Sequence, residues 1–135
     1  ELYRDPLVAW LPKNHPKAEQ KTYKIKDLET EDFIHTLPGQ DTDQERLIKQ
    51  EGLNLQTRFT TKDGFTTYQM VKVGLGVSFN QAMIARDWKE EVVQVPLSPK
   101  RFVSLGMALP KKEKVSPAVQ RFMDCLEQWM VEFLE

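Results

Sequence analysis

The chain is poor in the residue types on which most catalytic and cross-linking chemistry depends. Its 135 residues include one cysteine, Cys125, and two histidines, His15 and His35. A single cysteine forms no disulfide within the chain, which fits a reducing compartment, and its place on an apolar helical stripe predicts a buried structural thiol. No nucleophile elbow lies near either histidine, and neither an H-E-x-x-H nor a C-x-x-C motif is present. We therefore predict that the protein is not an enzyme and has no catalytic residue, metal or cofactor.

Long apolar runs and an excess of charge of one sign are also missing. No stretch approaches the ~20 apolar residues of a membrane-spanning helix, and no signal peptide is present. These absences predict a cytoplasmic protein without a membrane partner. The formal net charge is -1, with lysine and arginine scattered among the acids, so we do not expect this chain itself to bind DNA phosphates. Apolar residues make up 40%, as in ordinary globular domains.

Short apolar strands alternate with helices along the sequence. Residues 7–11 form a continuous apolar run closed by Pro12, which predicts a strand buried on both faces. Further strands are predicted over 33–36, 55–60, 77–80, 92–95 (stopped by Pro96) and 102–109 (stopped by Pro110). Helices are predicted over 41–51, 63–73 and 117–134, with short helical pieces over 25–29 and 82–88. This alternation predicts an α/β fold.

Capping residues mark where the three helices begin. Asp63 predicts the cap of the helix over 63–73. Thr42 and Glu45 have the spacing of a capping box, and Gly52 predicts the end of the same helix. Ser116 predicts the cap of the last helix, with Pro117 at its first position. The last helix is apolar on more than one side, so it needs a packing partner on two faces.

The most informative stretch is residues 66–80, T-T-Y-Q-M-V-K-V-G-L-G-V-S-F-N. It predicts an amphipathic helix that stops at Gly74, a tight turn through Gly76, and then a buried strand. None of its side chains breaks bonds readily, whereas a helix, a tight turn and a strand together form a corner that can hold a ligand. The stretch favours a sensor over an enzyme.

Several short segments, in this order, resemble the effector-binding domain of LysR-type transcriptional regulators. They are P-L-V-A-W-L-P at 6–12 with His15-Pro16, K-D-L at 26–28, F-I at 33–34 and V-G-L-G-V at 73–77. The resemblance spans essentially the whole chain and implies a type 2 periplasmic-binding-protein-like fold, in which two α/β subdomains hold a small ligand between them. It implies that 1–104 form the complete second subdomain, and that 105–135 are the returning strand and C-terminal helix of the first.

The family pattern also implies where an effector is bound. The second subdomain contributes the turn after the second strand and the strand after the glycine turn, and the adjacent strand-to-helix connection can add a hydroxyl. The candidate effector-binding residues are Thr36, Leu37, Pro38, Gly39, Thr60, Thr61, Ser78, Phe79 and Asn80. For Thr36 and Thr60, hydrogen bonding to their own backbone is the alternative. Many relatives have a proline near residue 80, and this chain has none there.

The charges beside this site leave the charge of the effector open. Effectors of the family are often carboxylates, but Asp41, Asp43 and Glu45 crowd the first turn of the helix that would receive an anion. Lys62 on the neighbouring loop can offset them. The same three acids invite a calcium interpretation, but they lack the loop and the glycine of an EF-hand.

Together these observations predict an effector-sensing domain whose small-molecule ligand allosterically controls DNA binding. DNA is a partner only through the family's N-terminal winged helix, which is absent from this chain. The alternative is a solute-binding module of a transporter with a related fold. The last helix is expected either to form a homo-oligomer or to fold back onto its own sheet. The predicted oligomer interface consists of Phe122, Trp129, Met130 and Phe133.

Overall fold

Strands and helices alternate along the chain in the computed structural model, which describes residues 1–88, 91–109 and 115–134. The elements are β1 (Tyr3–Pro12), β2 (Tyr23–Lys24), a 3-10 helix (Ile25–Thr30), β3 (Asp32–Thr36), α1 (Asp43–Glu51), β4 (Gln56–Thr61), α2 (Gly64–Lys72), β5 (Ser78–Gln81), a second 3-10 helix (Ala82–Ala85), β6 (Val92–Ser98), β7 (Phe102–Leu105) and α3 (Pro117–Leu134). They form two compact units, Asp5–Val103 and Glu1–Arg4 with Ser104–Glu135.

The predicted strand ends differ most from the structure at β6 and β7. β6 continues through Pro96 to Ser98, and Pro96 pairs with Val8 of β1. Proline has no backbone N–H, so the strand loses one hydrogen bond there and is not otherwise interrupted. β7 ends at Leu105, because Gly106 follows it and glycine weakens a strand. Pro110, the predicted end of that strand, lies outside the described residues.

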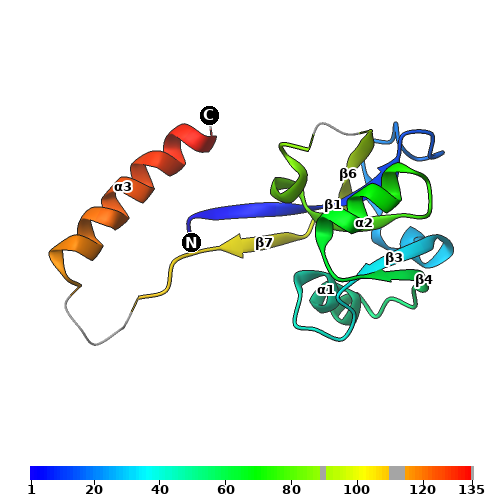
Figure 1. Ribbon diagram of the computed structural model, residues 1–135, viewed down its shortest axis with the longest axis horizontal. Coiled ribbons are helices and arrows are strands. Elements are labelled where there is room, and N and C mark those ends of the chain that lie inside the picture. The colour runs from blue at the N-terminus through cyan, green and yellow to red at the C-terminus, as the bar shows by residue number, and fades with distance from the viewer. Residues whose placement is uncertain (89–90, 110–114, 135) are drawn as a thin grey trace. The chain divides into compact units, whose positions relative to one another are not determined.

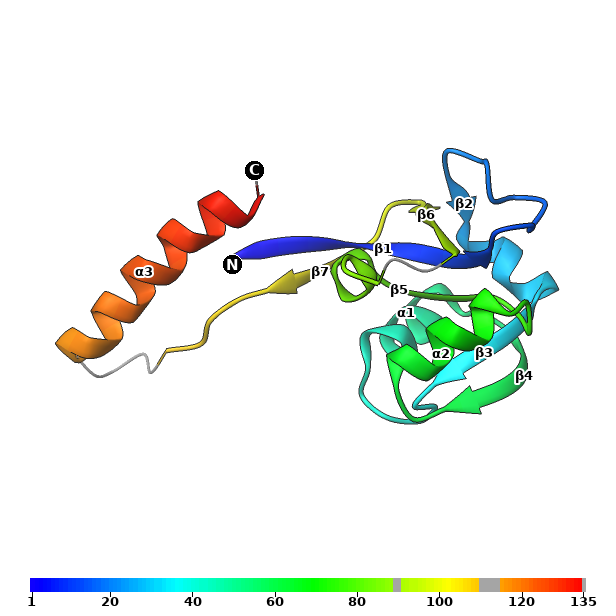
Figure 2. The same cartoon turned by 45° about the horizontal axis from the view of Figure 1, so that its top comes forward.

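The larger unit is built on β1. Its main sheet has the strand order β2-β6-β1-β5, and β7 also pairs with β1. β1 runs antiparallel to β5 and β6, whereas β3 and β4 form a separate parallel pair. α1 contacts β5, and α2 contacts β3, β4 and β5, as Figures 1 and 2 show from two directions. β3 leads into the loop before α1, and β4 leads into the loop before α2. Because β3 and β4 are parallel, both loops begin at the same edge of this pair.

β1 is buried on both faces, as its uninterrupted apolar run predicts. Leu7, Ala9 and Leu11 belong to one hydrophobic cluster, and Val8 and Trp10 belong to a second on the other face. Because successive side chains of a strand point to opposite faces, one continuous run supplies both clusters. Each residue of this run is at most 5% exposed.

The stretch 66–80 forms the predicted helix, turn and strand. α2 is followed by Gly74 with a positive φ of 79°, a conformation that only glycine adopts without strain. A Cβ atom on Gly76 would run into the backbone carbonyl of Asp32, so this position needs glycine for space. The Asp32 carbonyl accepts a 2.9 Å hydrogen bond from the N–H of Val77, which joins the turn to β3. β5 begins at the next residue.

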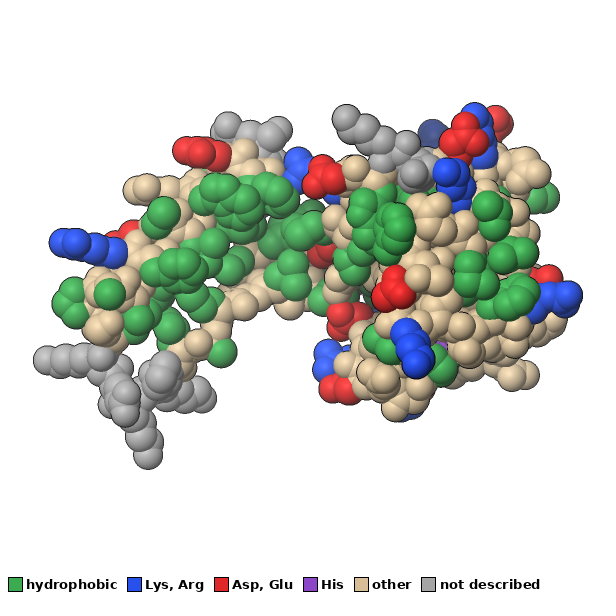
Figure 3. Space-filling view, viewed as in Figure 1, with side chains coloured by type: hydrophobic (Ala, Val, Ile, Leu, Met, Phe, Trp, Pro, Cys, Tyr) green, Lys and Arg blue, Asp and Glu red, His purple; other side chains and the backbone are tan. Residues whose placement is uncertain are grey.

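α3 belongs to the smaller unit and begins as predicted. The hydroxyl of Ser116 accepts a hydrogen bond from the N–H of Val119. The prediction of a buried Cys125 is wrong, because much of the helix surface is uncovered and the thiol is exposed with it. Phe122 and Trp129 are 60% and 50% exposed. Figure 3 shows hydrophobic side chains along this helix. Over the described ranges, no helix is both long and apolar enough to span a membrane.

Candidate ligand site

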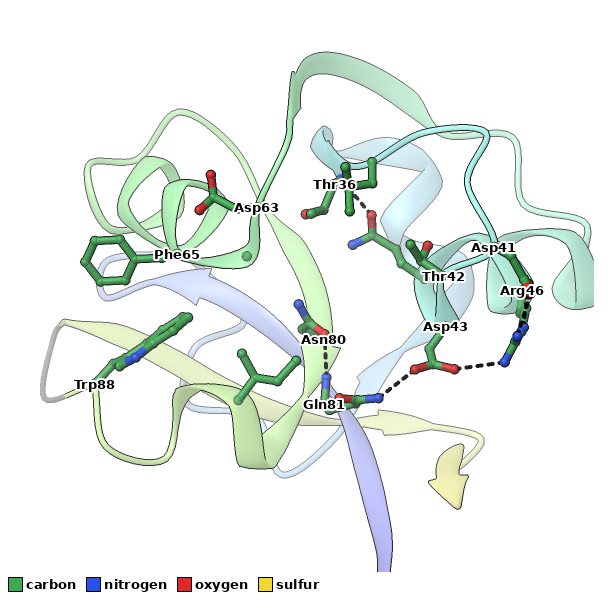
Figure 4. A pocket seen from close by; sticks show the side chains of 14 residues that line it. Thr36, Asp41, Thr42, Asp43, Arg46, Asp63, Phe65, Asn80, Gln81 and Trp88 are labelled. Atoms are coloured by element: carbon green, nitrogen blue, oxygen red, sulfur yellow. Dashed lines mark hydrogen bonds and ion pairs between the residues drawn. The ribbon is translucent and has the colours of Figure 1, made fainter. Parts of the chain in front are cut away.

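A cavity of about 560 Å³ lies in the larger unit, where α1 and α2 begin beside the end of β5 (Figure 4). Polar groups from the two helix starts and from β5 occupy one side of it, and aromatic side chains occupy another. Its lining residues are Thr36, Leu37, Asp41, Thr42, Asp43, Gln44, Arg46, Asp63, Gly64, Phe65, Asn80, Gln81, Ile84 and Trp88.

The capping box predicted at α1 is only half formed. The hydroxyl of Thr42 accepts a 3.1 Å hydrogen bond from the N–H of Glu45, as predicted. The carboxylate of Glu45 instead accepts from the N–H of Gly39 at 3.5 Å and lies 3.0 Å from Nε2 of His35, an ion-pair contact without hydrogen-bond geometry. Burial alone would raise the pKa of Glu45, but the Gly39 N–H and the charges of His35 and Lys49 outweigh burial and lower it. Glu45 thus fastens the turn beside the cavity to α1.

The side chain of Gln44 ties the ends of β3 and β5 to the first turn of α1. Its Oε1 accepts a 2.8 Å hydrogen bond from the N–H of Thr36. Its Nε2 donates to the carbonyl of Phe79 at 2.9 Å and to the hydroxyl of Ser78 at 3.2 Å. That hydroxyl donates in turn to the carbonyl of Ile34 at 2.8 Å. Because Gln44 is only 6% exposed, these bonds are shielded from water and fix the floor of the cavity.

Three threonine hydroxyls form a second buried network behind the cavity. Thr67 of α2 lies 2.7 Å from the hydroxyl of Thr36 and 2.6 Å from that of Thr61. Thr67 also donates to the carbonyl of Asp63 at 3.2 Å. The Thr36 hydroxyl therefore bonds to α2, which holds the end of β3 against the helix.

Three of the predicted effector-binding residues line the cavity: Thr36, Leu37 and Asn80. Leu37 has a positive φ of 50°, which is strained for a residue with a Cβ and is held by the hydrogen bond from its N–H to the carbonyl of Thr61. The structure places Ser78 and Phe79 in the core, at 0% exposure. The others do not line the cavity, namely Pro38, Gly39, Thr60 and Thr61.

The acidic side chains around the cavity already have partners. Asp41 accepts two hydrogen bonds of 2.8 Å from the guanidinium of Arg46, which hold its pKa low. Asp43 lies 3.4 Å from the same guanidinium and accepts a 2.6 Å bond from Nε2 of Gln81. Asp63 caps α2 by accepting from the N–H and the hydroxyl of Thr66, which lower its pKa. Asp41 and Asp63 are therefore ionised at neutral pH.

These partners also bear on the calcium interpretation of Asp41, Asp43 and Glu45. Asp41 and Asp43 turn toward Arg46, while Glu45 turns toward His35, so the three carboxylates do not converge. Over residues 1–88, 91–109 and 115–134, no group of three histidine, cysteine or acidic side chains has the geometry to hold a metal ion.

The apolar side of the cavity consists of residues that the sequence reasoning did not select. Phe65 and Trp88 (Figure 4) meet edge to face, with ring centroids 5.2 Å apart. Ile84 also lines the cavity. Trp88 also packs on Tyr68 at 4.9 Å, and its carbonyl accepts a hydrogen bond from the Tyr68 hydroxyl. Phe65 could have been found, because it follows the predicted helix cap at Asp63. Trp88 reaches the cavity only through the tertiary fold.

Comparison with known proteins gives a consistent result. The family described as the LysR substrate binding domain matches residues 1–131. YvbU of Bacillus subtilis, described as an uncharacterized HTH-type transcriptional regulator, is 26% identical over 129 residues. That match covers 94% of this chain but 44% of YvbU, so the chain spans less than half of that relative. The relative is described as a transcriptional regulator, which agrees with the prediction that this protein is not an enzyme.

Solved structures show the same fold. HinK, a LysR family transcriptional regulator from Pseudomonas aeruginosa, matches with a TM-score of 0.74 at 23% identity, over 95% of this chain and 46% of HinK. The regulatory domain of CcmR from Synechocystis PCC6803, solved in complex with 2-PG, matches with a TM-score of 0.73 at 20% identity, over 96% of this chain and 64% of that domain's chain. The predicted α/β fold of the type 2 periplasmic-binding-protein kind is confirmed.

Proposed function

Because this chain belongs to the LysR substrate binding domain family, we propose that it is the effector-sensing part of a LysR-type transcriptional regulator. Its ligand is a small molecule bound in the cavity beside α1 and α2. One observation carries the proposal: polar groups from the starts of two helices and from β5 converge on a cavity that has an aromatic side. A concave, mostly apolar site with a few placed polar groups is typical of small-molecule binding.

The division of the chain suggests how such a signal is passed on. We propose that residues 1–104 are the second subdomain and that 105–135 complete the first, a division that the compact unit Asp5–Val103 supports. Binding between two subdomains favours one relative pose over others, and the energy available for the change is the difference in affinity for those poses. In the whole regulator, a homo-oligomer in the cytoplasm, the change of pose alters how the winged helices meet DNA.

Within the cavity, Asn80 is the best-placed of the predicted contacts. Its Oδ1 accepts a 2.9 Å hydrogen bond from the N–H of Gln81, which fixes the amide, and its Nδ2 lies beside Gly64. Thr36 and Leu37 approach from the end of β3. Gln44 fixes the floor and keeps the backbone of β3 and β5 in register with α1.

A thermal-shift screen of metabolites on a chain that carries both complete subdomains tests the proposal. An effector should raise the melting temperature by several degrees at saturating concentration, because it binds only the folded state. The variant Asn80→Leu should fold and lose most of that shift, whereas Thr57→Val, an exposed change on β4, should keep it. A ligand that stabilises Asn80→Leu as strongly as the unmodified protein would place the binding site elsewhere.

A further inference from the structure

The cavity carries information about the charge of its ligand. We propose that it accepts a small molecule that joins a protonated amine to an apolar ring. The inference rests on the proposed function and narrows it, because it names the chemical class that this side of the site selects. It concerns the Asp5–Val103 unit, which contains all the lining residues that the structure describes.

Charge is the first argument. Asp41, Asp43 and Asp63 line the cavity, and Arg46 is the cation among the lining residues that the structure describes. The Arg46 guanidinium donates two 2.8 Å hydrogen bonds to Asp41, so its positive charge is largely balanced by that carboxylate. Its contact with Asp43 is longer, at 3.4 Å. Asp43 therefore keeps part of its negative charge, and Asp63 has no cation beside it among the described lining residues. Two helix starts add roughly half a positive charge each, which leaves the site negative.

The helix starts are the second argument, because anions in α/β proteins bind to uncapped helix amides. In this chain both starts use their own side chains instead. Thr42 accepts from the N–H of Glu45 at α1, and Asp63 accepts from the N–H of Thr66 at α2. Each cap fills one of the amide donors at its helix start. A carboxylate or phosphate entering the cavity would compete with these caps for the remaining amides and would face Asp43.

The acceptors on Asp43 and Asp63 are suited to an ammonium group. Each carboxylate has about four lone-pair sites, and the hydrogen bonds described above fill only part of them. Asp43 is held in place by Gln81, and Asp63 by Thr66, so both present a fixed charge rather than a mobile one. An ammonium with three donors can bond to one of these carboxylates without breaking its existing contacts.

The aromatic side is the third argument. Phe65 and Trp88 form an edge-to-face pair at 5.2 Å, and Phe65 is 51% exposed. An apolar ring packed against this pair would cover that surface. An amine attached to the ring gains further from the aromatic faces, since they attract cations. Figure 4 shows the aromatic pair on one side and Asp43 on the other, with Asn80 and Gln81 between them.

Three probes of similar size test the charge preference: benzylamine, benzyl alcohol and benzoate. Backbone amide shifts of this chain, followed by NMR during titration of each probe, report both the affinity and the place of binding. We expect benzylamine to shift the signals of Phe65, Asn80 and Trp88 and to bind about tenfold more tightly than benzoate, with benzyl alcohol between them.

Two isosteric variants identify the carboxylates responsible. Asp43→Asn and Asp63→Asn each remove one negative charge. Asparagine at position 63 can still cap α2, and asparagine at position 43 can still accept the hydrogen bond from Gln81. Each should weaken benzylamine binding by about threefold to tenfold and leave benzyl alcohol unchanged. Asp32→Asn, at the far end of β3, is the matched control and should leave all three affinities unchanged.

The outcomes separate the two proposals. Benzoate binding as tightly as benzylamine at the same signals would overturn the ligand class but leave the cavity as a small-molecule site. If no probe shifts the cavity signals, the ligand class is wrong and the cavity itself loses its support. Equal losses in Asp32→Asn and Asp63→Asn would trace the preference to net charge rather than to the site, and would also overturn the inference.

Discussion

At the residue scale, Gln44 has the largest structural role of the side chains around the cavity. It is nearly buried and satisfies the N–H of Thr36 and the carbonyl of Phe79 at once. We expect Gln44→Ala to lower the free energy of unfolding by about 2–4 kcal/mol, because it leaves both buried groups without a partner. Urea denaturation measures the loss. Gln50→Ala, an exposed change on the same helix, should cost under about 0.5 kcal/mol. Equal effects of the two variants would contradict this role.

Asp5 predicts a pH dependence of stability. Its carboxylate is 0% exposed and accepts the N–H of Met83 at 3.2 Å through both oxygens. Burial raises the pKa of Asp5 above its ordinary value of 3.8, and the Met83 hydrogen bond offsets part of that rise. The folded state therefore binds this proton more tightly than the unfolded state does. The stabilisation from Asp5 is present below pH 3.8 and is lost as pH rises through the raised pKa.

Asp5→Asn isolates this contribution, since asparagine cannot ionise but still accepts from Met83. The stability of the variant relative to the unmodified chain should increase between pH 4 and pH 7, by about 1.4 kcal/mol for each unit by which the folded-state pKa is raised. Denaturation at a series of pH values provides the measurement. A stability difference that stays constant over this range would show that Asp5 does not carry the predicted shift.

At the element scale, the turn between α2 and β5 distinguishes two reasons for glycine. Gly74→Ala should cost about 1 kcal/mol, because alanine resists a positive φ although there is open space around the site. Gly76→Ala should cost about 3 kcal/mol or more, because the new Cβ meets the Asp32 carbonyl and must push β3 away. Thermal melts of the two variants give the comparison. A smaller loss in Gly76→Ala than in Gly74→Ala would contradict the close approach.

Local signals predicted the elements well, and the partners of individual side chains less well. The caps at Thr42, Asp63 and Ser116 are confirmed because a cap depends on residues within one turn. The second half of the capping box was wrong because His35 and Gly39, brought near by the fold, compete for the carboxylate of Glu45. A sequence pattern identifies a hydrogen-bond donor that is close in the chain. It gives no information on whether a donor brought near by the fold will bind the same carboxylate instead.

At the scale of the whole molecule, α3 predicts self-association. Phe122 and Trp129 are exposed, and Trp129 stacks on Phe133 with ring centroids 4.8 Å apart. An exposed apolar surface of this kind is typical of an interface. Analytical ultracentrifugation should show association of the chain that increases with concentration, and Trp129→Lys should weaken it at least about tenfold.

Gln128→Lys is the matched control for α3, because it adds the same charge at an exposed polar position of the same helix. It should leave the association unchanged. A monomer at every concentration would contradict the predicted interface of Phe122, Trp129, Met130 and Phe133. Equal weakening by the two lysine variants would point to charge rather than apolar contact.

The candidate site shows where sequence reasoning ends. Thr36, Leu37 and Asn80 were selected from the family pattern and do line the cavity, although their contact with a ligand stays a prediction. Ser78 and Phe79 were selected with them because the family pattern assigns ligand contacts to the strand after the glycine turn as a whole. In the fold, Phe79 packs on Phe33 with centroids 5.8 Å apart, and the Ser78 hydroxyl is used by Ile34 and Gln44.

The sequence by itself determined the family, the doubly buried strand β1, the glycine turn after α2, and the order and kind of the elements other than the two-residue strand β2. The family was predicted from the resemblance of short segments. The elements, β1 and the turn follow from apolar periodicity, caps and punctuating glycines, which act between residues close in the chain. Tertiary structure alone decided that Trp88 joins Phe65 on one side of a cavity, that Gln44 ties three elements together, and that Arg46 neutralises Asp41. Such contacts join residues distant in the chain or choose among near neighbours, and their energies depend on distances that no local pattern specifies.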